Sequence, residues 1–262
     1  MSNATEHEAI TDRPPAPKTR RAAKIIRTIG WTSVGLGLFL LGFVVHQLFI
    51  TTYFAQQNNE TLKVEAGQYF EGVTISEVEY VAPDVTDPQS PSVPSEPTEP
   101  SEPAESEEPR TLLVEETPEQ GEAFAIIRIP SIERLADGWT VAQGVSRADL
   151  KNGVGHMPST PLPGQPGNAV LPGHRTTYGA PFHELDELEV GDIIEVETAI
   201  GLNVYEVRES IIVRPTEIWV TNPRPGSWIT LSTCNPKFSS RERLIIFAEL
   251  VAGPNYDVIY NT

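Results

Sequence analysis

The sequence has one cysteine, Cys234, among its 262 residues, so no disulfide can form within the chain. It also lacks a CxxC or HExxH motif, a cluster of cysteines and histidines, and an acidic run that resembles a calcium loop. The GQPG turn at 164–167 is followed by neither a lysine nor a helix start, which argues against a nucleotide-binding loop. We therefore expect no metal and no cofactor.

Basic residues are scarce: 19 lysines and arginines face 36 acidic residues, and the formal net charge is −17. Without a basic patch, a nucleic-acid partner is not predicted. The acidic excess is concentrated between Asp84 and Glu116, where ten acidic residues and one basic residue, Arg110, sum to −9 and leave −8 for the rest.

One long apolar run, Ile29–Ile50, has 22 residues and no charged side chain, enough to cross ~30 Å of hydrocarbon. It is longer than the core of a typical signal peptide and lacks the small-residue cleavage pattern, and a buried globular helix is a weaker alternative. After the run, only Lys63 is basic before Tyr80. The positive-inside rule therefore predicts a single span with a cytoplasmic N-terminus and an extracellular C-terminal part. The basic residues before the span are Arg13, Lys18, Arg20, Arg21, Lys24 and Arg27.

These features divide the chain into a cytoplasmic tail (1–28), a transmembrane helix (29–50), an extracellular stalk (51–118) and a folded domain (119–262). Within the stalk, 61–64 and 72–76 are compatible with short strands. Residues 82–118 are low in complexity, and the stretch 91–109 is almost entirely Pro, Ser, Glu and Thr, which predicts a disordered, semi-stiff linker. It would act as a spacer that holds the domain away from the bilayer, or as a passive tether.

The folded domain consists of short β-branched runs separated by glycine- and proline-rich turns, with brief helices at 147–152 and 182–188. This pattern predicts an all-β, closed or nearly closed β-barrel. The expected strands lie in 123–132, 140–145, 169–171, 192–199, 203–213, 227–233 and 244–248.

Cys234 ends the strand at 227–233, because Pro236 cannot donate to a β-ladder. Arg243 opens the next apolar run, so the two residues converge if the strands are neighbours. A free cysteine is most often a small buried apolar residue. An unpaired cysteine in an exported domain, however, favours a reactive thiol or an intermolecular bond.

A reactive thiol needs a base or a cation beside it, and His174 is the favoured partner because it follows a short apolar strand and a glycine. His183 fits a solvated helix face, and His156 fits a structural contact with the backbone. His7 and His46 lie in the cytoplasmic tail and near the outer end of the span, which removes them from an exported site.

The segments GHRTTYGAPF (173–182), TLSTC (230–234) and RERLIIFA (241–248) together resemble the sortases, membrane-anchored cysteine transpeptidases of Gram-positive surfaces, and class E in particular. The resemblance covers about 122–251 and implies a closed eight-stranded barrel, with Cys234 as nucleophile, His174 as its histidine partner and Arg243 as the arginine that stabilises the oxyanion. Arg241 is the rival arginine. Asn235 and Ser232 depart from the class E pattern, which leaves the subclass, and with it the preferred sorting signal, undefined.

The resemblance further implies cleavage of an LPxTG- or LAxTG-like sorting signal after threonine, through a Cys234 thioester. The acyl group would pass to an amine of a peptidoglycan precursor (lipid II) or to a pilin lysine. A pilin-polymerising class C enzyme and a non-catalytic, surface-displayed barrel are the alternatives. Class C carries a lid with a DPW- or DPF-like motif, and the nearest match here is Asp87-Pro88-Gln89.

Overall fold

The computed structural model describes residues 18–46, 51–80 and 110–260. The chain divides into two compact units, Met1–Gln47 and Leu48–Thr262. The first contains helix α1 (Lys18–Val45). Its stretch Ala23–Val45 is long and apolar enough to cross a membrane, with a mean hydropathy of 1.8. It begins six residues before the predicted span, and residues 47–50 of that span lie outside the described residues.

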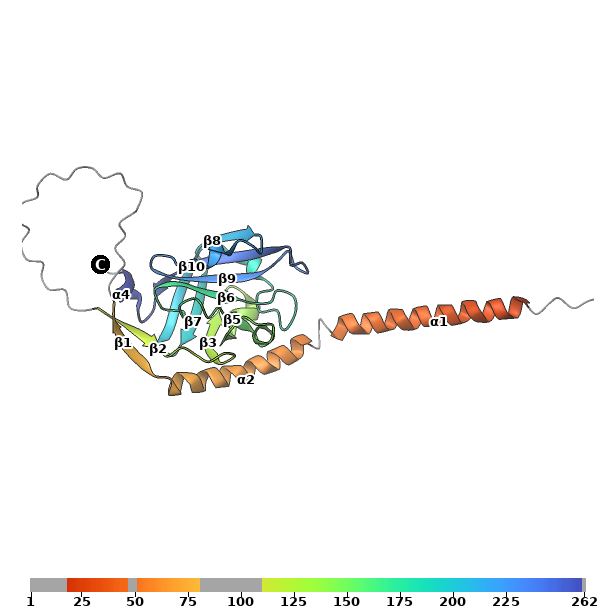
Figure 1. Ribbon diagram of the computed structural model, residues 1–262, viewed down its shortest axis with the longest axis horizontal. Helices are drawn as coiled ribbons and strands as arrows, with labels where there is room; N and C mark the ends of the chain where they lie inside the picture. Colours follow the sequence, from red (N-terminus) through yellow and green to blue (C-terminus); the bar gives the residue numbers. More distant parts are fainter. Residues whose placement is uncertain (1–17, 47–50, 81–109, 261–262) are drawn as a thin grey trace, which may run out of the picture. The chain divides into compact units, whose positions relative to one another are not determined.

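The second unit is built around an eight-stranded sheet with the strand order β5-β4-β3-β7-β8-β10-β9-β6 (Figure 1). Its two edge strands also meet, since Met157 N donates to Val170 O at 2.9 Å and Val154 forms a bridge with Gly173. The sheet is thus a nearly closed barrel, which confirms the predicted fold class. The strands are β3 (Ala123–Arg128), β4 (Trp139–Gln143), β5 (Val154–His156), β6 (Gly167–Pro172), β7 (Ile193–Thr198), β8 (Gly201–Val213), β9 (Ser227–Asn235) and β10 (Glu242–Ala252).

Alternating side chains direct the barrel strands onto one core. In β7, Ile194 and Val196 are fully buried while their neighbours are half-buried, as expected for a strand with a single inward face. Tyr205 and Val207 on β8 and Leu231 on β9 join the same core cluster. Period-two burial therefore fixes the register of these strands, because a slip by one residue would expose the apolar set.

Short helical turns connect the strands. The predicted helices at 147–152 and 182–188 are single 3₁₀ turns, η2 (Asp149–Lys151) and η3 (Leu185–Glu187). The other connections contain α3 (Glu133–Ala136) and η4 (Ile218–Thr221), and α4 (Tyr256–Tyr260) follows β10.

The segment after the apolar helix differs from the expected stalk or short strands. Residues Thr51–Gly72 form helix α2, which runs along the barrel beside β3 (Figure 1). Ala55, Leu62 and Ala66 are buried, and their spacing of seven and four residues places them on one helix face. This spacing outweighs the β-branched residues at 61–64, which suggested a strand.

A two-stranded antiparallel ribbon follows α2, formed by β1 (Ile75–Glu79) and β2 (Thr111–Glu115). Tyr80 N donates to Arg110 O at 2.7 Å, so the segment 81–109, which lies outside the described residues, starts and ends at one point of the ribbon. The spacer interpretation is therefore wrong, because α2 joins the barrel before this segment begins. The compact body includes 51–80 and 110–118, and the predicted stalk and the domain start at 119 do not describe it.

Glu115 ties this ribbon to the barrel and carries a pH-dependent prediction. It is 3% exposed, and its Oε2 accepts a hydrogen bond from Ala199 N at 2.9 Å in the β7–β8 turn. Burial raises the pKa of Glu115 from 4.5 to about 7, although the Ala199 hydrogen bond opposes the rise. Between these two values the folded chain binds the proton and the unfolded chain does not, so stability falls as pH rises.

Between about pH 5 and about pH 8, the wild-type protein should lose up to ~3 kcal/mol of unfolding free energy through Glu115. We expect Glu115→Gln to lack this loss. Denaturant unfolding at the two pH values measures this difference. The matched control is Glu116→Gln, since Glu116 is the exposed neighbour and should keep the wild-type pH dependence. An unchanged pH dependence in Glu115→Gln would contradict the assignment.

Candidate functional site

Cys234 and Arg243 lie directly opposite each other on neighbouring antiparallel strands. Cys234 is the penultimate residue of β9, Arg243 is the second residue of β10, and their Cα atoms are register partners. Residues opposite each other in an antiparallel pair present their side chains on the same face. The thiol and the guanidinium therefore share one face of the sheet.

That face is the outer one, away from the main core. Along β10, Leu244 and Ile246 belong to the main core cluster, whereas Ile245 and Phe247 belong to a second cluster with Val220 of η4. Arg243 alternates with Leu244 and so lies on the face of Ile245 and Phe247. The β8–β9 connection, which contains η4, therefore covers part of the face that carries the thiol.

The β8–β9 connection is held by a buried polar relay. Thr230 on β9 donates to Asn168 Oδ1 at 2.7 Å. Asn168 on β6 in turn donates through Nδ2 to the carbonyls of Val220 at 3.1 Å and Asn222 at 3.0 Å. The relay fixes the covering loop to the two strands that lead to the site, and nothing in the sequence pattern assigned this role to Asn168.

His174 leaves the sheet beside Cys234. Strand β6 runs parallel to β9, with Pro172 paired to Ser232. His174 and Cys234 therefore each lie two positions beyond this pair. Gly173 N donates to Ser232 O at 3.0 Å, and Thr233 Oγ1 donates to Gly173 O at 2.8 Å. The ring of Tyr178 lies 5.2 Å from the His174 ring, centroid to centroid.

Partial burial lowers the pKa of His174 below its usual value, so its imidazole is neutral at neutral pH. A neutral imidazole beside a thiol can accept the thiol proton and later return it. The residues that carry a thiol, an imidazole and a guanidinium stand at one end of three adjacent strands, and these three groups can support acyl transfer through a thioester.

The guanidinium of Arg243 lies against the β9–β10 turn, where Nη1 donates to Ser240 O at 3.0 Å and Glu242 O at 2.9 Å. The rival Arg241 precedes β10 and is exposed. Register and position therefore favour Arg243 over Arg241 as the arginine that shares a sheet face with Cys234.

The other histidines have different surroundings. His156 is fully buried, and its ring nitrogens lie 2.6 Å from Gln143 Oε1 and 2.9 Å from Pro161 O, consistent with the structural contact that the sequence suggested. His183 Nδ1 lies 2.7 Å from Arg175 O, so this ring is packed against the loop after β6 rather than freely solvated. His7 lies outside the described residues.

Arg175 is a site residue that sequence reasoning missed. Its side chain is 2% exposed, and Nη1 donates to Cys234 O at 3.1 Å. The arginine was visible in the GHR segment next to His174, but its burial and its contact depend on the parallel pairing of β6 with β9. Periodicity along either strand alone does not reveal that pairing.

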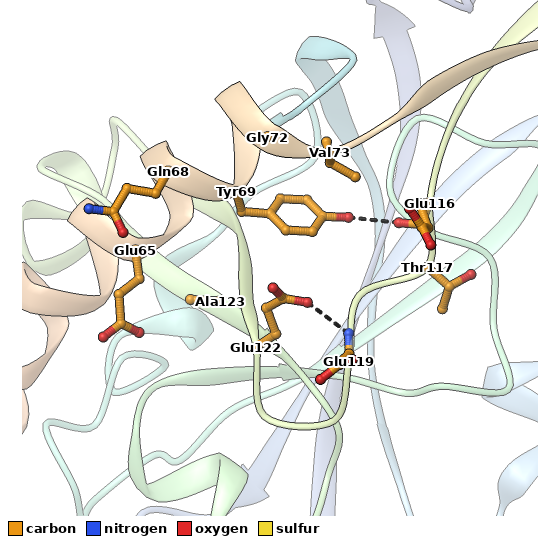
Figure 2. Close-up of a pocket in the computed structure, with 10 residues that line it drawn as sticks. All are labelled: Glu65, Gln68, Tyr69, Gly72, Val73, Glu116, Thr117, Glu119, Glu122 and Ala123. Carbon is orange, nitrogen blue, oxygen red and sulfur yellow. Dashed lines mark hydrogen bonds between the residues drawn. The ribbon is translucent and has the colours of Figure 1, made fainter.

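A hollow of about 580 Å³ lies elsewhere, between the end of α2 and the β2–β3 connection. Figure 2 shows its wall, with Tyr69 donating to Glu116 O and Glu119 N donating to Glu122. None of its lining residues belongs to β6, β9 or β10. Its glutamates do not form a metal site: in residues 18–46, 51–80 and 110–260, no three His, Cys, Asp or Glu side chains are placed to hold an ion.

Comparisons with known proteins show the family of this chain. Residues 127–251 match the family described as Sortase domain. Sortase SrtE1 of Streptomyces coelicolor is 34% identical over 149 residues, covering 51% of this chain and 42% of that protein. Sortase D of Bacillus subtilis is 32% identical over 139 residues, covering 51% of this chain and 67% of that protein.

A crystal structure of Sortase E1 from Streptomyces coelicolor with a tripeptide in the active site is 33% identical and covers 52% of this chain and 92% of that one, with a TM-score of 0.47. The chain thus spans less than half the length of SrtE1 and two thirds of Sortase D. The family match includes β6, β9 and all but the last residue of β10, and the chain belongs to the sortase family of cysteine transpeptidases.

Proposed function

We propose that this protein is a membrane-anchored sortase, similar to class E, that cleaves an LPxTG- or LAxTG-like sorting signal after threonine. It then transfers the cleaved protein to an amine of a cell-wall precursor. The observation that carries the proposal is the register of Cys234 with Arg243, with His174 at the end of the adjacent strand. These three residues are the proposed catalytic set, and the reaction needs no cofactor.

In the first half-reaction, His174 takes the thiol proton, and the Cys234 thiolate attacks the threonine carbonyl carbon. The resulting oxyanion accepts hydrogen bonds from the Arg243 guanidinium, whose fixed charge and planar fork suit that role. When the Thr–Gly bond breaks, His174 gives its proton to the glycine amine, and the acyl group stays on sulfur as a thioester.

In the second half-reaction, the acceptor amine attacks the thioester carbonyl. The new amide bond forms, the C–S bond breaks, and the proton lost by the amine restores the Cys234 thiol by way of His174. The proposed acceptor is the cross-bridge amine of a peptidoglycan precursor such as lipid II. The sequence element nearest to a class C lid, Asp87-Pro88-Gln89, lies outside the described residues.

Incubating the full chain in detergent micelles with LPxTG and LAxTG peptides and a short glycine amine tests the proposal. Mass spectrometry should show a new amide between the threonine carbonyl and the amine, and a peptide–protein thioester on Cys234 when the amine is omitted. Absence of both species with every peptide would overturn the function.

We further propose that α1 spans the cell membrane with its N-terminus in the cytoplasm. Basic residues precede its apolar stretch, and the chain from 48 onward forms the separate barrel unit. Protease added to intact cells should then remove epitopes in 119–262 and spare an epitope in the first 28 residues. Full protection of the barrel would contradict this orientation.

A further inference from the structure

Arg175 is a buried cation beside the proposed catalytic residues, and it follows His174 directly in the chain. Its side chain is 2% exposed. Removing a guanidinium from water is costly unless its charge and its N–H groups are matched by partners. The partners that it does have therefore indicate what the folded chain uses it for.

Two of those partners are at the end of β9. Nη1 donates to Cys234 O at 3.1 Å and to Asn235 Oδ1 at 2.7 Å. The third is Asp186 in η3, whose Oδ1 lies 2.9 Å from Nη2. One planar group thus joins the loop after β6 to the main chain of the thiol-bearing residue, across 59 positions of sequence.

The connection continues to β10. Asn235 Nδ2 donates to Glu242 Oε2 at 3.0 Å, and Glu242 is the residue before Arg243. The Arg175–Asn235–Glu242 chain therefore crosses all three strand ends that carry the proposed catalytic set.

We propose that Arg175 is a positioning residue that holds the Cys234 end of β9 at a fixed distance and orientation from His174, an inference that rests on the proposed function. It acts on the main-chain oxygen of Cys234 and not on the sulfur, so it is not itself catalytic.

A lysine could not replace it. Arginine reaches three acceptors from two nitrogens held in one plane, whereas an ammonium is a single point on a flexible stem. Arg175→Lys therefore keeps the charge and loses the planar connection, and Arg175→Met loses both. The two variants separate the electrostatic effect from the positional effect.

The full chain in detergent micelles is the material for the test, because its single cysteine makes iodoacetamide alkylation specific for Cys234. For Arg175→Met we expect slower alkylation and a kcat reduced on the order of 10²-fold with little change in KM. For Arg175→Lys we also expect a low kcat, because the charge remains but the planar connection is lost. The other charged or titratable groups around this region are Asp186, Lys237, His174, His183, Glu242 and Arg243.

Asp186→Asn tests the same link from the far side, since its carboxylate touches Arg175 but not β9. We expect a smaller fall in kcat, and an Arg175→Met/Asp186→Asn double variant no slower than Arg175→Met alone, because both changes break one connection. Arg208→Met is the matched control: Arg208 pairs with Glu206 and Glu249 on the barrel surface and should behave as wild type.

If folded Arg175→Met kept wild-type kcat and alkylation, the inference would be wrong. Should Arg175→Met fail to fold, the decision falls to Arg175→Lys and Asp186→Asn, and wild-type kcat in both would overturn it. Alkylation needs no substrate, so the two proposals fail separately. A wild-type protein that transfers no peptide overturns the function, whereas an alkylation profile insensitive to Arg175 overturns this inference.

Discussion

Replacing Cys234 by alanine should abolish peptide transfer, because the acyl group then has no sulfur on which to form the thioester. The chain has no second thiol that could substitute. Transfer of a fluorescent LPxTG or LAxTG peptide to a glycine amine, followed by chromatography, measures the loss. Continued formation of the amine-linked product by Cys234→Ala would refute the proposed function.

The other two members of the proposed set should show graded losses. His174→Ala should be nearly as severe as Cys234→Ala, since neither the thiol nor the leaving amine then has its proton carrier, a loss of about 10²–10⁴ in rate. Arg243→Ala should cost on the order of 10²–10³, as is typical for one oxyanion donor. Arg243→Lys should recover little, because a point charge does not reproduce the fork.

Arg241→Ala is the internal control for this series. Arg241 is exposed and precedes β10, whereas Arg243 is in register with Cys234, so Arg241→Ala should keep most of the activity. The reverse result, an inactive Arg241→Ala with a normal Arg243→Ala, would show that the wrong arginine was assigned, even if the chain still transferred peptides.

The sequence was informative where structure depends on local order. The alternating apolar residues predicted β7 to β10, and strands that follow each other in sequence often pair, so the convergence of Cys234 and Arg243 could be expected. The three-residue strand β5 (Val154–His156) was missed because three residues do not define a period. The expected positions of strands β3, β4 and β6 agree with those observed.

Contacts between distant segments could not be predicted in this way. The pairing of Tyr80 with Arg110 across the acidic segment, and that of Arg175 with Cys234, depend on how the folded body closes. Helix α2 was missed for a different reason. Its buried face includes the polar Asn59. Burial of this side chain is favourable only because Thr140, far away in the sequence, supplies its hydrogen bonds.

The second large effect is expected when helix α2 and the β1–β2 ribbon are deleted. A soluble form that starts at residue 119 lacks both. Leu62 and Leu112 are buried against the barrel, and Asn59 Oδ1 accepts hydrogen bonds from Thr140 N and Oγ1, each at 2.9 Å. Each leucine contributes ~1.5–3 kcal/mol, and each hydrogen bond adds about 1 kcal/mol. Their loss, about 5 kcal/mol or more, rivals the whole stability of a typical domain, about 5–15 kcal/mol.

The same truncation reaches the proposed site through the loop after His174. A Cβ at Gly179 would clash with the Trp139 ring and lie 3.1 Å from the Cβ of Ala55 on α2, so loop, ring and helix meet there. The adjacent Tyr178, whose ring packs near His174, has a φ of 52°, a conformation that is strained for a residue with a side chain. Contacts from α2 help to hold it.

We therefore expect residues 119–262 to unfold at least ~10 °C below residues 51–262 in thermal melts, since ~5 kcal/mol corresponds to that shift or more at this size. Below its melting temperature, the shorter form should also transfer peptide on the order of 10²-fold more slowly, because the loop beside His174 loses its support. Circular dichroism melts and the peptide assay measure the two effects.

The matched control deletes residues 81–109 and keeps every residue of α2, β1 and β2. Replacing residues 81–109 by Asn-Gly should close Tyr80 onto Arg110 as a hairpin and keep the melting temperature and the activity of 51–262. The wider deletion of 84–116 would remove β2 (Thr111–Glu115) with its buried Leu112 and should lower the melting temperature below that of 51–262. If 119–262 instead matched 51–262 in both stability and rate, α2 and the ribbon would be accessory to the barrel, and their proposed support of the His174 loop would be wrong.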